Sequence, residues 1–178
     1  MLLTIIDYGM GNLRSVQKAF ESVGAKALVT QKAKDIEKAD KIVLPGVGAM
    51  QPAMESLEHL KLIPAIKQGI ADKKPFLGIC LGLQLLFEES DEGGRAKGLG
   101  ILKGKVTRFT KLKVPHMGWN ALNIKNDCPL LKNLKVPAYA YFCHSYYVKP
   151  KDKAVTAAST DYGITFTSMV SQDNILGV

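Results

Sequence analysis

Residues Lys74-Pro75-Phe76-Leu77-Gly78-Ile79-Cys80-Leu81-Gly82-Leu83-Gln84 decide the fold of this chain. An apolar run leads into a cysteine that stands between two glycines, and a helix-like pattern follows it. We interpret the stretch as a β-strand, a sharp turn with Cys80 at its apex, and a helix. A residue at such an apex has a strained backbone, so we expect that only glycine fits on either side of it.

Two interpretations of Cys80 are open at this point. Gly-x-Cys-x-Gly has the form of the Gly-x-Ser-x-Gly nucleophile elbow of serine hydrolases, with sulfur in place of oxygen. A helix that begins at Leu81 would direct its first amides toward the sulfur, favouring the thiolate and offering donors to an oxyanion. The alternative is a buried structural cysteine in a glycine-rich turn.

Length and composition indicate one globular domain that spans residues 1–178 and is large enough to bury a core. The first residues, Met1 to Asp7, fit a first strand better than a signal peptide. No apolar run approaches the roughly 20 residues of a membrane span, so we expect no membrane contact. Cys80, Cys128 and Cys143 are odd in number and lack metal-ligand spacing, which is typical of a cytoplasmic protein. We predict neither a metal site nor a cofactor.

The formal net charge of +8 raises the question of a nucleic-acid partner. The lysines are spread along the whole chain, and no dense basic block is interleaved with aromatic residues. We therefore expect solvated helix faces and loops, and no nucleic-acid binding. Salt-dependent binding to duplex or single strands would contradict this.

Strand and helix patterns alternate through the first half of the chain. Strands are predicted at Leu2–Ile6, Ala27–Thr30, Ile42–Leu44 and Phe76–Ile79. Helices are predicted at 13–23, 35–39, 50–72 with a break near Pro64, and 81–88. This alternation favours a parallel sheet covered on both faces, with the chemistry at the carboxyl ends of the strands. The glycine turns at Gly9, Gly46 and Gly78 all fall at that edge.

The second half is rich in β patterns, which predict a mixed or antiparallel extension of the sheet. The predicted strands are Gly98–Phe109, Tyr139–Val148, Ala154–Ser159, Ile164–Val170 and Ile175–Val178. Residues 90–97 form a predicted polar surface loop. The fold class expected is α/β, a three-layer flavodoxin-like sandwich with a mostly parallel sheet and a β-rich C-terminal half.

Three further positions are candidates for chemistry. The turn Pro45-Gly46-Val47-Gly48 either is a plain tight turn or presents an amide to an oxyanion beside the Leu81 amide. His116 and His144 are candidate bases for a cysteine nucleophile, but neither has a carboxylate nearby in sequence. An edge or core histidine satisfied by the backbone is the alternative for each.

Taken together, these motifs resemble the class I (triad) glutamine amidotransferases, and within them the glutaminase subunits of imidazole glycerol phosphate synthase from histidine biosynthesis. The matching segments run in family order across the chain: Ile6 to Asn12, Leu44 to Gly48, Pro75 to Phe87, Pro115 to Asn120, His144 to Tyr147 and Thr160 to Gly163. The segments at 6–12 and 115–120 are the ones that point to this subunit.

The resemblance implies a glutaminase in which the Cys80 thiolate attacks the amide of L-glutamine, and backbone amides of Val47 and Leu81 hold the oxyanion. Residues matching the glutamine-binding positions are Gly46, Gly48, Gln84, Ser145 and Tyr146. The ammonia would pass to a (β/α)₈-barrel cyclase subunit in a heterodimer. Asn12 and Trp119 match positions at that subunit interface.

The family pattern continues beyond Val178 with a Gln-Phe-His-Pro-Glu segment, which supplies the general base and the carboxylate that orients it. The sequence stops before this segment, so we expect an active enzyme to have it C-terminal to Val178. Two alternatives are a truncated docking subunit without activity and the glutaminase subunit of another synthase.

Overall fold

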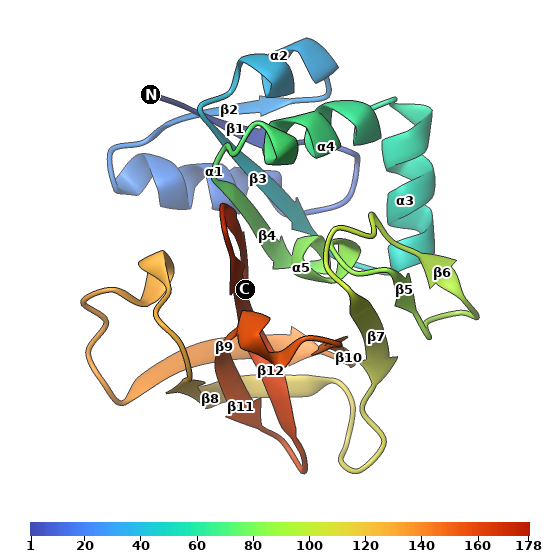
Figure 1. The fold of residues 1–178 in the computed structure, drawn as a ribbon, viewed down its shortest axis with the longest axis vertical. Coiled ribbons are helices and arrows are strands. Elements are labelled where there is room, and N and C mark those ends of the chain that lie inside the picture. Colours follow the sequence, from blue (N-terminus) through green and yellow to red (C-terminus); the bar gives the residue numbers. More distant parts are fainter.

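The computed structural model describes residues 1–178. The first half forms a parallel sheet in the order β2-β1-β3-β4. Its strands are β1 (Leu2–Ile6), β2 (Lys26–Thr30), β3 (Lys41–Gly46) and β4 (Phe76–Cys80). Parallel strands are joined by helical crossovers, so their carboxyl ends lie together at one edge. Figure 1 shows these strands side by side. Of the three predicted glycine turns, Gly9 follows β1 and Gly46 ends β3, whereas Gly78 lies within β4, two residues before its end.

Helices cover both faces of this sheet, as the sequence predicts. They are α1 (Leu13–Ser22), α2 (Ala33–Lys38), α3 (Met50–His59), α4 (Ile63–Ala71) and α5 (Leu81–Leu85). Side chains alternate along a strand, so β1 sends Ile5 to the α1 face and Ile6 to the opposite face. On that opposite face a core cluster of 27 buried residues includes side chains from α2, α3, α4 and α5. This arrangement gives the three layers.

Two helix boundaries have clear local causes. Pro64 lies in the first turn of α4, where a missing amide hydrogen is tolerated, so the predicted break separates α3 from α4. Helix α5 ends at Leu85, earlier than the predicted residue 88. The carbonyls of Leu85 and Leu86 accept hydrogen bonds from the amides of Leu99 and Ile101, which replace the next helical turn.

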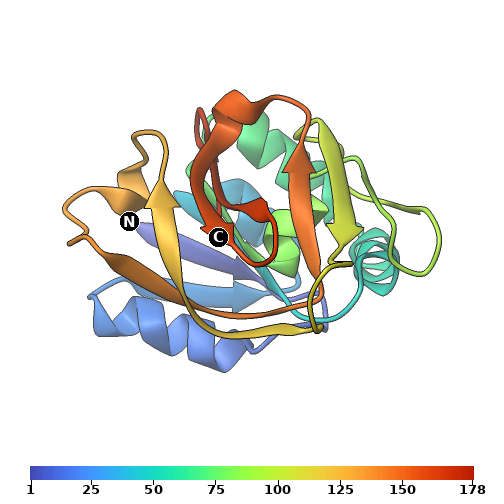
Figure 2. The same ribbon diagram turned by 90° about the horizontal axis from the view of Figure 1, so that it is seen from below.

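The second half extends the sheet with mixed strand directions, as predicted, in the order β4-β13-β12-β10-β7-β5-β6. The strands are β5 (Glu89–Ser90), β6 (Ala96–Lys97), β7 (Gly104–Arg108), β8 (His116–Ile124), β9 (Ala138–His144), β10 (Tyr146–Pro150), β11 (Thr156–Asp161), β12 (Thr165–Gln172) and β13 (Ile175–Gly177), with short 3₁₀ turns at Pro129–Leu131 and Lys153–Val155. Strand β11 pairs with β12 and β8, and β8 pairs with β9 (Figure 2).

Several details of this half differ from the sequence prediction. The run predicted at Gly98–Phe109 is a strand only from Gly104, because residues 98–102 fold back to bond the end of α5. The run 139–148 is two strands separated at Ser145. Strand β8 was not predicted, and the predicted loop at 90–97 contains the ends of the short β5–β6 pair. None of the helices is both long and apolar enough to cross a membrane.

Candidate active site

Cys80 closes β4 in a conformation that ordinary residues avoid, with φ 55° and ψ −107°. The glycines on either side allow the strand and helix to approach each other. A Cβ on Gly78 would lie 2.6 Å from the carbonyl oxygen of Gly82, and one on Gly82 would lie 1.7 Å from that of Leu44. The prediction that only glycine fits on each side of the apex is confirmed. A strained backbone of this kind costs about 1–3 kcal/mol and marks functional turns.

The surroundings of the Cys80 thiol act on it in opposite directions. Burial is the main influence and raises the pKa of the thiol, the Leu81 amide hydrogen bond lowers it, and negative charge on Cys143 raises it again. The net direction is upward, so the thiol form is favoured at neutral pH. Activation of this sulfur as a nucleophile therefore requires a proton acceptor.

The glycine turn lies directly beside the cysteine elbow. Gly46 at the end of β3 is the register partner of Cys80 at the end of β4. Val47 and Gly48 follow, and Gly48 has a φ of +96° that favours glycine. A Cβ on Gly46 would lie 2.0 Å from the hydroxyl oxygen of Tyr8. The structure thus brings the turn and the elbow together, as the oxyanion-hole hypothesis requires.

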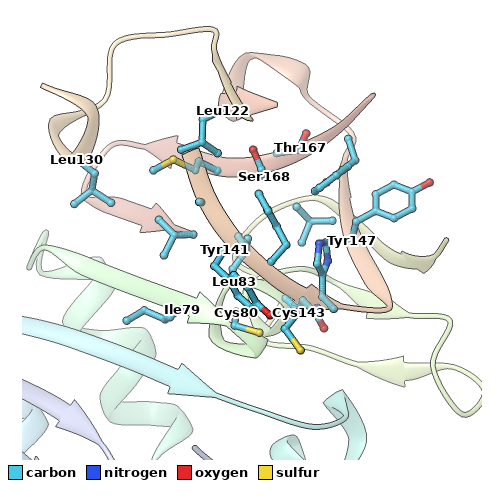
Figure 3. A pocket seen from close by; sticks show the side chains of 18 of the residues that line it. Ile79, Cys80, Leu83, Leu122, Leu130, Tyr141, Cys143, Tyr147, Thr167 and Ser168 are labelled. Atoms are coloured by element: carbon cyan, nitrogen blue, oxygen red, sulfur yellow. The ribbon is translucent and has the colours of Figure 1, made fainter. Parts of the chain in front are cut away.

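A cavity of about 470 Å³ opens beside Cys80, between the end of β4 with α5 and the strands β9, β10 and β12 (Figure 3). Most of its lining side chains are apolar. Cys80, Gln84 and Tyr146 are among them, and the Gln84 side-chain amide donates a 3.4 Å hydrogen bond to the Tyr146 carbonyl. The predicted residues Gly46, Val47, Gly48 and Ser145 do not line this cavity.

His116 and His144 form a hydrogen-bonded pair whose proton positions follow from their partners. His144 Nδ1 lies 2.7 Å from the Tyr146 carbonyl oxygen, so Nδ1 carries the hydrogen and Nε2 accepts. His116 Nδ1, at 3.0 Å, donates to His144 Nε2, and His116 Nε2 accepts from the Asn120 amide at 3.3 Å. Both rings are therefore neutral, and their nitrogens are all occupied.

This network decides between the two interpretations of the histidines. His116 is buried, and burial lowers its pKa, with a further decrease from the charge of His144. Burial also lowers the pKa of His144. Although His144 lines the cavity with Cys80, it has no nitrogen free to accept a proton. The structure favours the structural role for both histidines, but the predicted backbone partner is found only for His144, since the partners of His116 are side chains.

Tyr8 is a residue near the site that the sequence reasoning missed. Its side chain is completely buried, and its hydroxyl has no hydrogen-bond partner. Burial raises the pKa of the Tyr8 phenol, and negative charge on Cys80 raises it further. The motif 6–12 contained Tyr8, but only the approach of β1 to the elbow shows that its hydroxyl stands against Gly46.

The two predicted interface residues lie on different elements. Asn12 caps α1, where its side-chain oxygen accepts a 3.3 Å hydrogen bond from the Ser15 amide. Trp119 lies on β8 with 73% of its surface exposed. Its cross-strand partner on β9 is Tyr141, and the two rings pack edge to face with centroids 5.8 Å apart. Sequence reasoning missed Tyr141 because it assigned no register to β8 and β9.

The comparisons with known proteins agree with this geometry. A family model described as glutamine amidotransferase class-I matches residues 4–178. The chain belongs to that family. Two solved structures share its fold, a glutamine amidotransferase (TM-score 0.77, 16% identity, 98% of this chain and 87% of that one) and PurLQS from Thermotoga maritima (TM-score 0.74, 17% identity, 99% and 85%).

Curated relatives narrow the family to imidazole glycerol phosphate synthase subunit HisH. The chain is 50% identical over 178 residues to HisH of Aquifex aeolicus, with 99% of this chain covered, and 50% identical over 175 residues to HisH of Caldanaerobacter subterraneus, with 98% covered. It is 46% identical over 183 residues to HisH of Bacillus subtilis, with 99% covered. The chain spans 86% of the length of each of these relatives.

Proposed function

We propose that this chain is the glutaminase subunit of imidazole glycerol phosphate synthase. It hydrolyses L-glutamine to glutamate and ammonia and delivers the ammonia to a cyclase subunit. That subunit makes imidazole glycerol phosphate and an aminoimidazole carboxamide ribotide for histidine biosynthesis. The observation that carries the proposal is the strained Cys80 elbow beside the glycine turn, in a chain about half identical to HisH proteins.

In the proposed reaction the Cys80 sulfur attacks the side-chain carbonyl carbon of glutamine. The carbonyl oxygen becomes an oxyanion that the amides of Val47 and Leu81 stabilise. Collapse of this intermediate breaks the carbon–nitrogen bond and releases ammonia, leaving a glutamyl thioester on Cys80. Water then attacks the thioester, which releases glutamate and restores the thiol. The backbone amide of Leu81 lowers the pKa of the Cys80 thiol, which supports its place beside the reacting carbon.

The proton acceptor for Cys80 is proposed to be a histidine that follows residue 178. His144 cannot serve, because its two ring nitrogens are occupied. Val178 lies beside the elbow, where its carbonyl accepts a 2.7 Å hydrogen bond from the Cys80 amide and its own amide donates to Gly78. A segment continuing from there would leave the sheet at the nucleophile. This position supports the family assignment of the base.

The glutamine is proposed to bind between the elbow and the start of β10. Gln84 and Tyr146 line the cavity with Cys80 and are joined by a hydrogen bond. Ser145 interrupts β9 and β10, and its carbonyl is held by the Phe109 amide at 3.1 Å. Gly46, the register partner of Cys80, and Gly48 are proposed to contribute backbone groups from the glycine turn, outside the lining of the cavity.

The cyclase subunit, with a (β/α)₈ barrel, is proposed to dock as a heterodimer over the exposed Trp119–Tyr141 pair and the start of α1 at Asn12. Exposed aromatic pairs of this kind are typical of interface anchors. Docking there would cover the cavity next to Cys80, since Tyr141 lines it, and would let ammonia pass without release to water. We place the complex in the cytoplasm, where three unpaired cysteines persist.

The test is glutamate release from L-glutamine by the purified full-length gene product, with and without the cyclase subunit and its ligand. We expect release to rise when the liganded partner is added. Cys80→Ala should abolish release while partner binding persists, and Cys128→Ala, a buried cysteine outside the cavity, should retain it. Turnover by Cys80→Ala would contradict the assignment of the nucleophile.

A further inference from the structure

A second thiol, Cys143, lies in the cavity next to Cys80. It belongs to β9, where Tyr139, Tyr141 and Cys143 alternate with less exposed residues and so share one face of the strand. Both thiols line the cavity beside the elbow. Figure 3 shows their sulfur atoms at the same end of the cavity, on β9 and on the elbow that faces it.

The electrostatics of the site follow from this arrangement of the two thiols. Negative charge on Cys143 raises the pKa of Cys80, an effect that requires proximity because Coulomb interactions weaken with distance. Both cysteines are unpaired and both residues reach solvent, although protein atoms surround enough of the Cys80 thiol to raise its pKa. Cys128, the remaining cysteine, is buried in a separate small cluster with Leu131 and Met169 and does not line the cavity.

We propose that Cys80 and Cys143 form a reversible disulfide when the protein meets a hydroperoxide, with Cys143 acting as the resolving thiol. The loss of activity that follows rests on the proposed function, because it assumes that Cys80 is the nucleophile. Formation of the bond itself does not.

The chemistry takes place in two steps. The Cys80 thiolate attacks one peroxide oxygen, the O–O bond breaks, and Cys80 becomes a sulfenic acid while the other oxygen leaves as water. The Cys143 thiolate then attacks the Cys80 sulfur. The S–O bond breaks, and hydroxide leaves and takes up a proton to give a second water. The two thiols lose two electrons in total, and hydrogen peroxide is reduced to two waters.

A disulfide sets a geometric requirement on strand β9 and the elbow. Bonded cysteines usually have Cα atoms about 4.4–6.8 Å apart. Strand β9 is an edge strand that pairs only with β8, so it can shift toward the elbow without breaking a second ladder. The positive φ of Cys80 presents its side chain at the apex of the turn rather than against the sheet. A disulfide here would hold β9 over the elbow.

The experiment treats the purified full-length gene product with hydrogen peroxide and maps its peptides by mass spectrometry without reduction. We expect a linked pair of Cys80 and Cys143 peptides that has lost two hydrogen atoms and separates after dithiothreitol. The rate of glutamine hydrolysis should fall as this disulfide forms and recover when dithiothreitol reduces it. Cys143→Ser, treated with hydrogen peroxide for the same long period, should gain two oxygen atoms on Cys80. Dithiothreitol should then fail to restore the activity that this variant had before treatment. Cys128→Ser should behave like the unmodified chain.

The outcomes separate this proposal from the proposed function. Absence of the linked peptides, or equal linkage of Cys128, would overturn the disulfide. Equal recovery of activity after reduction in Cys143→Ser would also overturn the resolving role. If the linked peptides form in a protein that never hydrolyses glutamine, the disulfide stands and the proposed glutaminase fails.

Discussion

Gly46 and Cys80 are register partners at the ends of two adjacent parallel strands, so the glycine turn and the cysteine elbow meet across one pair of strands. The place of Gly46 is fixed by its neighbours. A Cβ there would lie 2.0 Å from the Tyr8 hydroxyl oxygen and 3.1 Å from Leu81 Cβ. Leu81 carries the backbone amide that lowers the pKa of the Cys80 thiol. A side chain at position 46 therefore disturbs the elbow itself.

The first prediction follows from this crowding. Gly46→Ala should lower the free energy of unfolding by about 1–3 kcal/mol, the usual cost of overpacking, and should reduce glutamine hydrolysis. Gly93→Ala is the matched control, since a Cβ there meets nothing within 4 Å despite a φ of +65°. It should cost only about 1 kcal/mol of backbone strain and leave hydrolysis unchanged. Denaturant unfolding and a glutamate assay measure both effects, and equal destabilisation would contradict the argument.

The second prediction concerns the strain at Cys80, whose φ of 55° and ψ of −107° disfavour any side chain. Both Cys80→Gly and Cys80→Ala remove the thiol, but only glycine relieves the strain. We expect Cys80→Gly to be more stable than Cys80→Ala by about 1 kcal/mol, after subtracting the entropy that glycine adds to the unfolded chain. Thermal and urea unfolding of the pair gives the difference. A less stable glycine variant would show that the turn is not strained.

The elbow could be predicted from sequence because its physics is local. The backbone approaches very closely on both sides of the strained apex, so only glycine fits there. The sequence therefore shows a glycine on either side of Cys80. The parallel half of the sheet was predictable for a similar reason, since apolar runs alternate with helical periodicity there. The break at Pro64 also follows from one residue's backbone chemistry.

What depended on pairing between distant segments was not predictable. Strand β8 carries the exposed Trp119 and the buried His116. Its apolar and polar residues do not alternate regularly, so the sequence does not predict its register with β9. The pairs His116 with His144 and Trp119 with Tyr141 exist only through that register. The contact between Tyr8 and Gly46 arises because β1 and β3 are adjacent parallel strands. The placement of Cys143 and Cys80 in one cavity likewise depends on how distant segments pack together.

The third prediction uses the unpartnered hydroxyl of Tyr8. A buried hydroxyl without a hydrogen bond costs about 1–3 kcal/mol, so removing it should not destabilise the protein. We expect Tyr8→Phe to match or exceed the original stability by up to about 1 kcal/mol. Tyr8→Leu, which also loses the ring that packs in the core, should be less stable by about 1–3 kcal/mol. Marked destabilisation of Tyr8→Phe in urea unfolding would indicate a partner for the hydroxyl.

The fourth prediction tests the docking surface. Trp119 is largely exposed, so Trp119→Ala should change the free energy of unfolding by less than about 0.5 kcal/mol. If the cyclase subunit docks on it, the same change should weaken association by about 2 kcal/mol or more, roughly 30-fold. Val23→Ala alters an exposed apolar residue at the far end of α1 and should leave association unchanged. Calorimetric titration with the partner measures this, and equal affinities would remove Trp119 from the interface.

The fifth prediction is a pH dependence of stability that comes from the His116–His144 pair. Burial lowers the pKa of both rings below their ordinary value of 6.5. As the pH falls through that value the unfolded chain takes up protons that the folded protein does not, so the free energy of unfolding must fall with it. The stabilising contribution of the pair is complete above about pH 7 and decreases toward the lowered pKa values.

Stability should therefore be measured by urea unfolding between about pH 5.5 and 7, above the range in which most carboxylates titrate. His116→Gln removes one of the two groups while keeping a side chain that can donate to His144, and it should show a shallower decrease. His59→Gln changes an exposed histidine on α3 and should follow the original curve. A curve for His116→Gln as steep as the original would mean that this ring already binds its proton in the folded protein, which the donor–acceptor chain from Asn120 to Tyr146 does not allow.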